Sequence, residues 1–124
     1  MKFVSRHIKG FGRGKLLGFP TINLVIPDQF DLKEGIYAVR VEIEDRVFKG
    51  ALHFGPIPTF GLNDNSLEVF LIDTEFDLVL GLDTSRIEVE VVKRLRDVES
   101  FNSKDDLVHQ IADDVSRVRK VVYL

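Results

Sequence analysis

The sequence predicts a mainly β domain that ends in one α-helix. Segments in which apolar and polar residues alternate recur along most of the chain, a pattern typical of strands with one buried face. Polar and proline-containing turns separate them, and the C-terminal segment changes to helical spacing. Several short strands joined by turns suggest an antiparallel sandwich or barrel, and periodicity alone leaves both open.

Composition fits a single compact domain. The chain has 124 residues, of which 44% are hydrophobic and 30% charged, so we expect an independent core and no wholesale disorder. The net charge of −3 argues against a general nucleic-acid binder, and the absence of cysteine excludes disulfides and zinc–thiolate sites. With no apolar run of transmembrane length and no signal-peptide pattern, we expect no membrane association and a cytoplasmic location.

A glycine-rich basic segment precedes the first strand that the pattern predicts. It contains Gly10, Gly12, Arg13, Gly14, Lys15 and Gly18. Backbone N–H groups in such a loop can form an anion-binding nest, for which a phosphate is the obvious guest. The common phosphate motifs do not fit, because Leu16 replaces the hydroxyl of a Walker A loop and the glycine spacing differs from the dinucleotide fingerprint.

Alternation over residues 21–26 predicts a strand directly after this loop. Thr21 and Asn23 would share one face, roughly 7 Å apart. A hydroxyl oxygen beside nucleotide phosphates suits Mg²⁺, which prefers hard oxygen ligands and keeps several waters. An edge strand with a polar outward face explains the same residues equally well.

The next segments predict a hairpin followed by a break. Residues 39–43 alternate, and a turn at residues 44–46 leads into Val47. Pro56 and Pro58 are expected to interrupt the chain after this hairpin, and residues 62–66 to form a polar turn.

Glu68 is the best candidate for a catalytic group. On a strand over residues 67–72 it would share a face with Phe70 and Ile72, while the other face is also apolar. A carboxylate on a strand covered on both sides must reach a pocket or find a partner. It is therefore either a positioned base or a strand-end glutamate paired with a lysine or arginine.

The remaining elements are one more strand and the helix. Residues 86–91 alternate between charged and β-branched side chains, which indicates a strand with one solvated face and one buried face. Ser103 begins a capping pattern, with Asp105 and Asp106 in the first helical turn and basic residues near the other end. We expect this helix to cover the sheet.

Taken in order, these segments resemble the riboflavin kinase, or flavokinase, family. The glycine loop with its Pro-Thr-Ile-Asn end is similar to the family's signature. Four later segments also match in the family's order: residues 35–40, residues 54–61, residues 67–73, and a closing segment with Arg96, Phe101 and Asp114. The matches span nearly the whole chain.

The resemblance implies a small six-stranded antiparallel Greek-key β-barrel with a C-terminal α-helix. It also implies transfer of the γ-phosphate of ATP to the terminal hydroxyl of riboflavin, giving FMN. By matching residues, Glu68 would be the general base, Thr21 would bind Mg²⁺, and Asn23 would hold phosphate oxygens or metal-bound water. The segment from Gly10 to Gly18 would cover the nucleotide phosphates.

The resemblance places the flavin near Arg96 and Phe101. Phe101 is aromatic and suited to stacking on the flavin, but it could equally pack on Leu107 as a hydrophobic staple. Arg96 could equally be a surface residue. Three positions depart from the family pattern on this side, namely Ile57, Phe70 and Leu80.

Residues 1–124 are expected to form one riboflavin kinase domain, without the nucleotidyltransferase domain that makes FAD in many bacterial relatives. A monomer is favoured. The histidines His7, His53 and His109 are scattered and carry little weight. The alternatives are a flavin- or nucleotide-binding barrel without turnover, and a barrel used for protein interaction.

Overall fold

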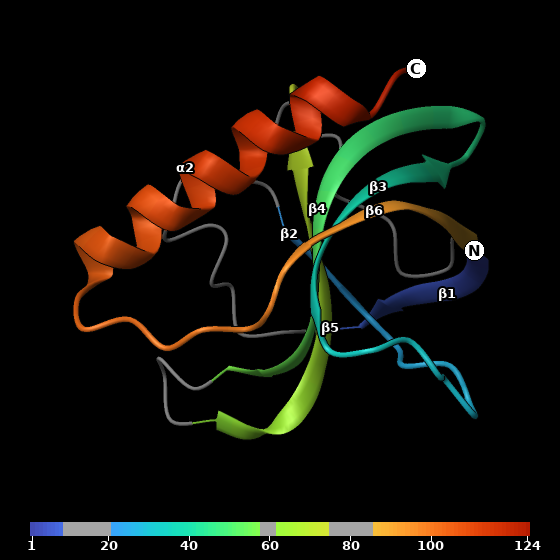
Figure 1. Ribbon diagram of the computed structural model, residues 1–124. Helices are drawn as coiled ribbons and strands as arrows, with labels where there is room; N and C mark the ends of the chain where they lie inside the picture. The colour runs from blue at the N-terminus through green and yellow to red at the C-terminus, as the bar shows by residue number, and fades with distance from the viewer. Residues whose placement is uncertain (9–20, 58–61, 75–85) are drawn as a thin grey trace.

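The computed structural model describes residues 1–8, 21–57, 62–74 and 86–124. For residues 57, 62 and 63 it describes the backbone only. This part of the chain forms six strands and one helix (Figure 1). The strands are β1 (Lys2–Ile8), β2 (Thr21–Leu24), β3 (Gly35–Ile43), β4 (Arg46–Ile57), β5 (Leu62–Ile72) and β6 (Arg86–Arg96). The helix is α2 (Lys104–Val121).

The strands close into an antiparallel barrel in the order β1-β2-β5-β4-β3-β6. Strands β3, β4 and β5 are consecutive neighbours, and the chain returns in β5 to pair with the earlier strand β2. This is a Greek-key arrangement. The fold class expected from the sequence is therefore confirmed. Strand β1 was not predicted from the sequence, yet it closes the barrel by pairing with both β2 and β6.

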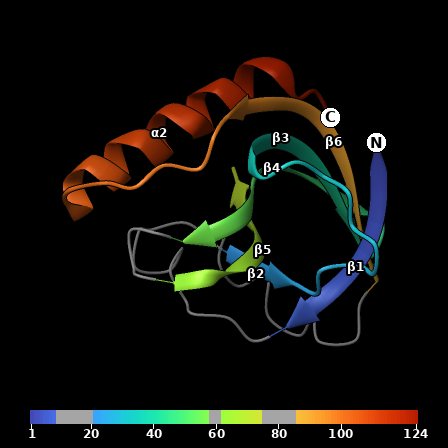
Figure 2. The ribbon, with the colours of Figure 1, turned by 60° about the horizontal axis from the view of Figure 1, so that its bottom comes forward.

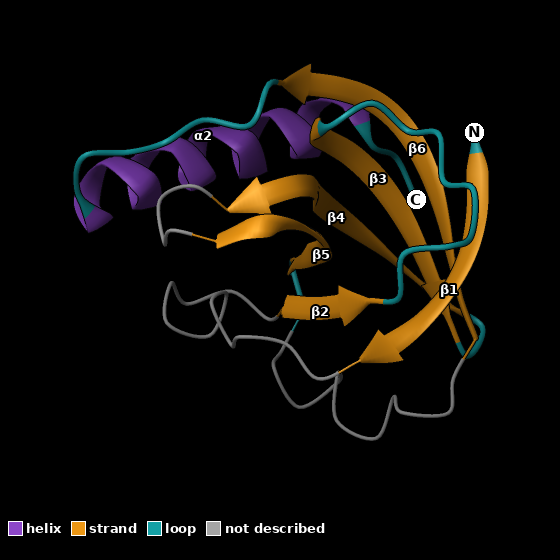
Figure 3. Cartoon of the chain, turned by 90° about the horizontal axis from the view of Figure 1, so that it is seen from below, coloured by secondary structure: helices purple, strands orange, loops and turns teal. Residues whose placement is uncertain are grey.

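Alternation along the strands divides the apolar residues into two clusters. One fills the barrel, and its largest fully buried side chains include Ile22, Leu52 and Leu67. The other includes Ala51, Phe70 and Ile72 from the strands together with one face of helix α2. Figures 2 and 3 show the helix lying along the outside of the barrel, over β3 and β4. Strand β5 is thus covered on both faces, as its sequence indicated.

The hairpin between β3 and β4 has a two-residue turn. Glu44 and Asp45 have φ angles of 49° and 67°, so both adopt the left-handed conformation that a type I′ turn requires. This confirms the turn predicted at residues 44–46.

Two sequence expectations about loops were wrong. Pro56 does not end its strand, because β4 continues to Ile57 through a register shift between Gly55 and Ile57. Such an irregularity tolerates proline, since the ladder hydrogen bond that proline cannot donate is already lost there. The polar residues 62–66 belong to β5 rather than to a turn. Pro58 lies outside the described residues.

Helix α2 begins as its capping pattern predicted. The Ser103 hydroxyl accepts a hydrogen bond from the backbone N–H of Asp106 at 3.1 Å. Leu107, Ile111 and Val115 are buried against the barrel. In the described part of the chain, no helix combines the length and apolar character needed to cross a membrane.

Candidate functional site

Three polar side chains lie in one row across neighbouring strands. Strand pairing sets Asn23 on β2 opposite Glu68 on β5, and Glu68 opposite His53 on β4. Directly opposed residues of antiparallel strands point to the same face, with Cβ atoms about 5 Å apart. Figure 3 shows these three strands side by side. The row therefore brings an amide, a carboxylate and an imidazole together.

The row lies on the outer face of the barrel, the same face on which helix α2 packs. Glu68 alternates with Leu67 and Val69, which point into the barrel, and shares its face with Phe70 of the helix-side cluster. The three polar residues are nonetheless buried, since Asn23, Glu68 and His53 are 8%, 1% and 6% exposed. Burial of a carboxylate restricts its motion and excludes bulk water, which suits a group that must accept a proton at a defined position.

Thr21 lies two residues before Asn23 on the same face, and strand pairing sets it opposite Phe70. The shared face predicted for Thr21 and Asn23 is thus confirmed. Their hydroxyl and amide oxygens are hard donors, which fits a Mg²⁺ ion held largely by substrate phosphates. Phe70 packs under the helix at a position where the family resemblance leads one to expect histidine.

The predicted nucleotide loop lies outside the described residues. This applies to Gly10, Gly12, Arg13, Gly14, Lys15 and Gly18. Its role stays a prediction from the sequence. Leu80, one of the three departures from the family pattern, also lies outside them, and Ile57 is described only as part of β4.

The two predicted flavin residues lie together at the other end of the row. Pairing continues from His53 to Ile36 on β3 and from Ile36 to Arg96 on β6. The guanidinium carbon of Arg96 is 5.8 Å from the centre of the Phe101 ring. At a strand spacing of about 4.8 Å, the four steps from Asn23 to Arg96 correspond to roughly 19 Å along the curved sheet.

The described contacts of Arg96 and Phe101 are structural. Arg96 forms an ion pair with Asp114 of the helix at 2.8 Å, and it donates to the Asp97 carbonyl at 3.0 Å. Phe101 packs against the cluster that contains Leu107, as the staple interpretation expects. Arg96 is therefore not a simple surface residue. Whether either side chain also contacts a flavin stays a prediction.

His53 is the residue that sequence reasoning set aside. Its Nε2 lies 3.0 Å from the Pro56 carbonyl oxygen, and its position opposite Glu68 depends on the pairing of β4 with β5. Strand parity within β4 shows which face His53 occupies, but nothing local in the sequence specifies its cross-strand neighbour.

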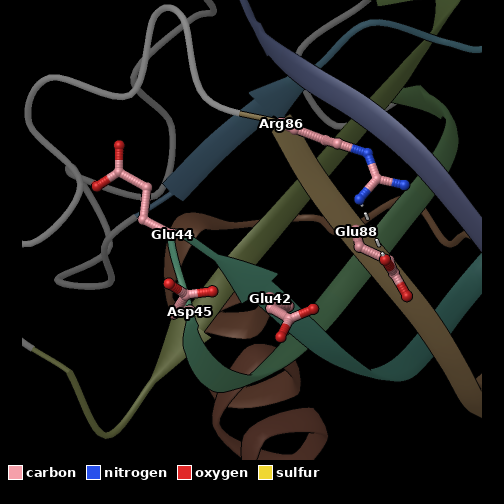
Figure 4. A pocket seen from close by; sticks show the side chains of 5 residues that line it. All are labelled: Glu42, Glu44, Asp45, Arg86 and Glu88. Atoms are coloured by element: carbon pink, nitrogen blue, oxygen red, sulfur yellow. Dashed lines mark ion pairs between the residues drawn. The ribbon is translucent and has the colours of Figure 1, made fainter.

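A hollow lies at the end of β3 that leads into the hairpin turn. It has a volume of about 280 Å³ and is lined by Glu42, Glu44, Asp45, Arg86 and Glu88 (Figure 4). Arg86 forms an ion pair with Glu88 at 3.6 Å, drawn as a dashed line in that view. Within the described ranges, no group of three or more histidine, aspartate or glutamate side chains could hold a metal ion.

Comparison with known proteins identifies the family. The family model described as riboflavin kinase, or flavokinase, matches residues 1–122. A bifunctional riboflavin kinase/FMN adenylyltransferase of Escherichia coli K12 is 33% identical over 117 residues, covering 94% of this chain and 36% of the relative. An RNA-binding riboflavin kinase of Bacillus subtilis is 33% identical over 114 residues, covering 91% of this chain and 47% of the relative.

A solved structure has the same fold. It is described as a macrolide-efflux protein from Streptococcus pneumoniae, and it matches with a TM-score of 0.81 and 28% identity over 98% of this chain and 39% of that one. The chain thus spans less than half the length of the relatives it matches. From the family match over nearly its whole length, together with the barrel, the chain belongs to the riboflavin kinase family.

Proposed function

We propose that residues 1–124 form a riboflavin kinase domain, which transfers the γ-phosphate of ATP to the 5′-hydroxyl of riboflavin and gives FMN. The observation that carries the proposal is the direct cross-strand pairing of Asn23 with Glu68 on a buried face. It sets a candidate phosphate ligand beside a candidate base in a chain of the riboflavin kinase family.

In this proposal Glu68 is the general base. It accepts the proton of the riboflavin 5′-hydroxyl while the oxygen attacks the γ-phosphorus. The bond from that phosphorus to the bridging oxygen breaks, and its electron pair leaves with ADP. Such a reaction needs mainly positioning and charge neutralisation, because the protein forms no covalent bond to the phosphoryl group.

The remaining residues bind and orient the substrates. The Thr21 hydroxyl binds Mg²⁺, and Asn23 holds phosphate oxygens or metal-bound water. The glycine loop with Arg13 and Lys15 covers the nucleotide phosphates. When bound, Mg²⁺ neutralises charge on the transferring phosphoryl group. The flavin ring lies toward Arg96 and Phe101, at the other end of the row.

The test incubates the purified chain with riboflavin, ATP and magnesium and separates the flavins by chromatography. Glu68→Gln is compared with Glu42→Gln, a control on an exposed glutamate of β3. We expect FMN from the wild type and the control, and about 10²- to 10⁴-fold slower formation by Glu68→Gln. Equal rates from all three would retain the kinase and reject Glu68 as base.

A folded wild type that forms no FMN would reject the kinase activity. A riboflavin titration followed by flavin fluorescence would then separate the two alternatives. Binding without turnover would indicate a flavin-binding barrel, and no binding would favour a protein-interaction barrel. The observation that favours the flavin-binding barrel is Phe70, which is buried and occupies a position where the family pattern has histidine.

A further inference from the structure

His53 flanks Glu68 on the side opposite Asn23. The register sets His53 of β4 directly across from Glu68 of β5, on the same buried face. Their Cβ atoms are therefore about 5 Å apart, a separation that the two side chains can bridge. The candidate base thus lies between an amide on the proposed nucleotide side and an imidazole on the proposed flavin side.

The hydrogen bond to Pro56 identifies which nitrogen of the neutral His53 ring carries the proton. The Pro56 carbonyl oxygen can only accept, so His53 Nε2, at 3.0 Å, carries the proton and donates it. In the neutral ring Nδ1 is then an acceptor. The partner carbonyl belongs to the same strand at its register shift, which ties the ring to β4.

An acceptor nitrogen across from Glu68 has a specific consequence for a base. A carboxylate only accepts hydrogen bonds, whereas the carboxylic acid formed during catalysis donates one. A neutral imidazole with Nδ1 as acceptor therefore stabilises the protonated carboxyl more than the ionised one. This difference favours proton transfer from the substrate hydroxyl to Glu68.

We propose that His53 is a positioning residue for the Glu68 base, an inference that rests on the proposed function. The hydrogen bond between the two side chains forms only when Glu68 is protonated, because a carboxylate and an acceptor nitrogen cannot hydrogen-bond to each other. Once Glu68 has taken the substrate proton, its new O–H donates to His53 Nδ1, and the proton stays on Glu68. His53 does not exchange a proton with riboflavin and is not itself the base.

Three substitutions separate this role from simple packing. His53→Leu removes both ring nitrogens, His53→Asn keeps an acceptor near the Nδ1 position, and His53→Gln keeps an amide near the Nε2 position. His109→Leu is the control, since His109 is exposed on helix α2. Thermal unfolding of each variant checks that the protein is folded.

We expect His53→Leu to lower kcat for FMN formation by about 10- to 100-fold, with the KM for ATP and riboflavin changed less than about twofold. His53→Asn should recover most of the loss, and His53→Gln should not. An unchanged kcat in folded His53→Leu, a loss confined to KM, or equal recovery by both amides would overturn the proposal.

A readout independent of turnover is the ¹⁵N NMR spectrum of the His53 ring. We expect the Nε2–H tautomer in the wild type and a shift of the Nδ1 resonance in Glu68→Gln. An Nδ1 resonance that does not move would refute the contact, even if the enzyme is an active kinase. A protein that moves this resonance but makes no FMN would instead refute the proposed function alone.

Discussion

Arg96 on β6 binds Asp114 on helix α2 through both carboxylate oxygens. Its Nε donates to Oδ1 at 2.9 Å and its Nη2 to Oδ2 at 2.8 Å, while Gln110 donates to Oδ1 at 3.1 Å. The side chains of Arg96 and Asp114 are only 12% and 4% exposed. This pair joins the helix to the barrel beside the proposed flavin end of the site.

We expect Asp114→Ala to lower the free energy of unfolding by about 3–5 kcal/mol, because Arg96 would keep a buried and uncompensated charge. The double variant Arg96→Met/Asp114→Leu should recover most of this loss. Urea unfolding measures both, with Asp113→Ala at an exposed position as control. A loss below about 1 kcal/mol would show that the pair is not needed for stability.

Thr21→Val should weaken the binding of Mg²⁺. The change removes the hydroxyl oxygen while keeping the side-chain shape, so we expect the Mg²⁺ concentration for half-maximal FMN formation to rise about tenfold. Thr21→Ser should behave like the wild type, and a chelator should stop the reaction in all three. A Mg²⁺ requirement unaltered by the valine would remove Thr21 from the metal site.

Gly50 makes room for Val69 inside the barrel. A Cβ atom at residue 50 would lie 2.5 Å from Val69 Cγ1 and 3.2 Å from Val39 Cγ2. Gly50→Ala should therefore destabilise the protein by about 1–3 kcal/mol through overpacking. In a Val69→Ala background the same substitution should cost much less, which a double-mutant cycle of thermal unfolding measures. Additive losses would contradict this account.

Asp45→Gly should stabilise the hairpin between β3 and β4. Asp45 has a φ of 67°, which glycine adopts without steric cost, so we expect a gain of about 0.5–1 kcal/mol in unfolding free energy. Asp45→Asn is the control, because it removes the same charge but tolerates this conformation less well than glycine. Equal gains from both would assign the effect to removal of the Asp45 charge beside the other acidic residues of the hollow.

Asp73 should contribute stability that depends on pH. A hydrogen bond from Arg119, at 2.8 Å, lowers the pKa of Asp73 from its usual 3.8, with the charges of Arg119 and Lys49 adding to this effect. Because the folded-state pKa is the lower one, the contribution is full above pH 3.8 and is lost as the pH falls through the folded-state pKa.

Stability curves of the wild type and Asp73→Asn should therefore differ slightly at neutral pH and converge in acid. The difference should be small and should shrink in salt, because the two side chains are 52% and 53% exposed. A difference that grows as the pH falls would contradict the sign of this effect.

The sequence alone was sufficient for several features of the local structure and for the family. Alternation identified both faces of β5 and the shared face of Thr21 and Asn23, because side-chain direction in a strand depends only on parity. The Ser103 cap and the turn at Glu44 and Asp45 were also readable, since each depends on a few adjacent residues. The motif order indicated the family, which the family match confirms.

Only the tertiary structure decided which strands are neighbours. The placement of His53 beside Glu68, the closure of the barrel by β1, and the Arg96–Asp114 pair all join residues distant in sequence. Strand register follows from packing the whole barrel, where a slip of one residue would turn every apolar side chain to the wrong face. The continuation of β4 through Pro56 also could not be predicted locally. The effect of a proline depends on whether a neighbouring strand needs the N–H group that proline lacks.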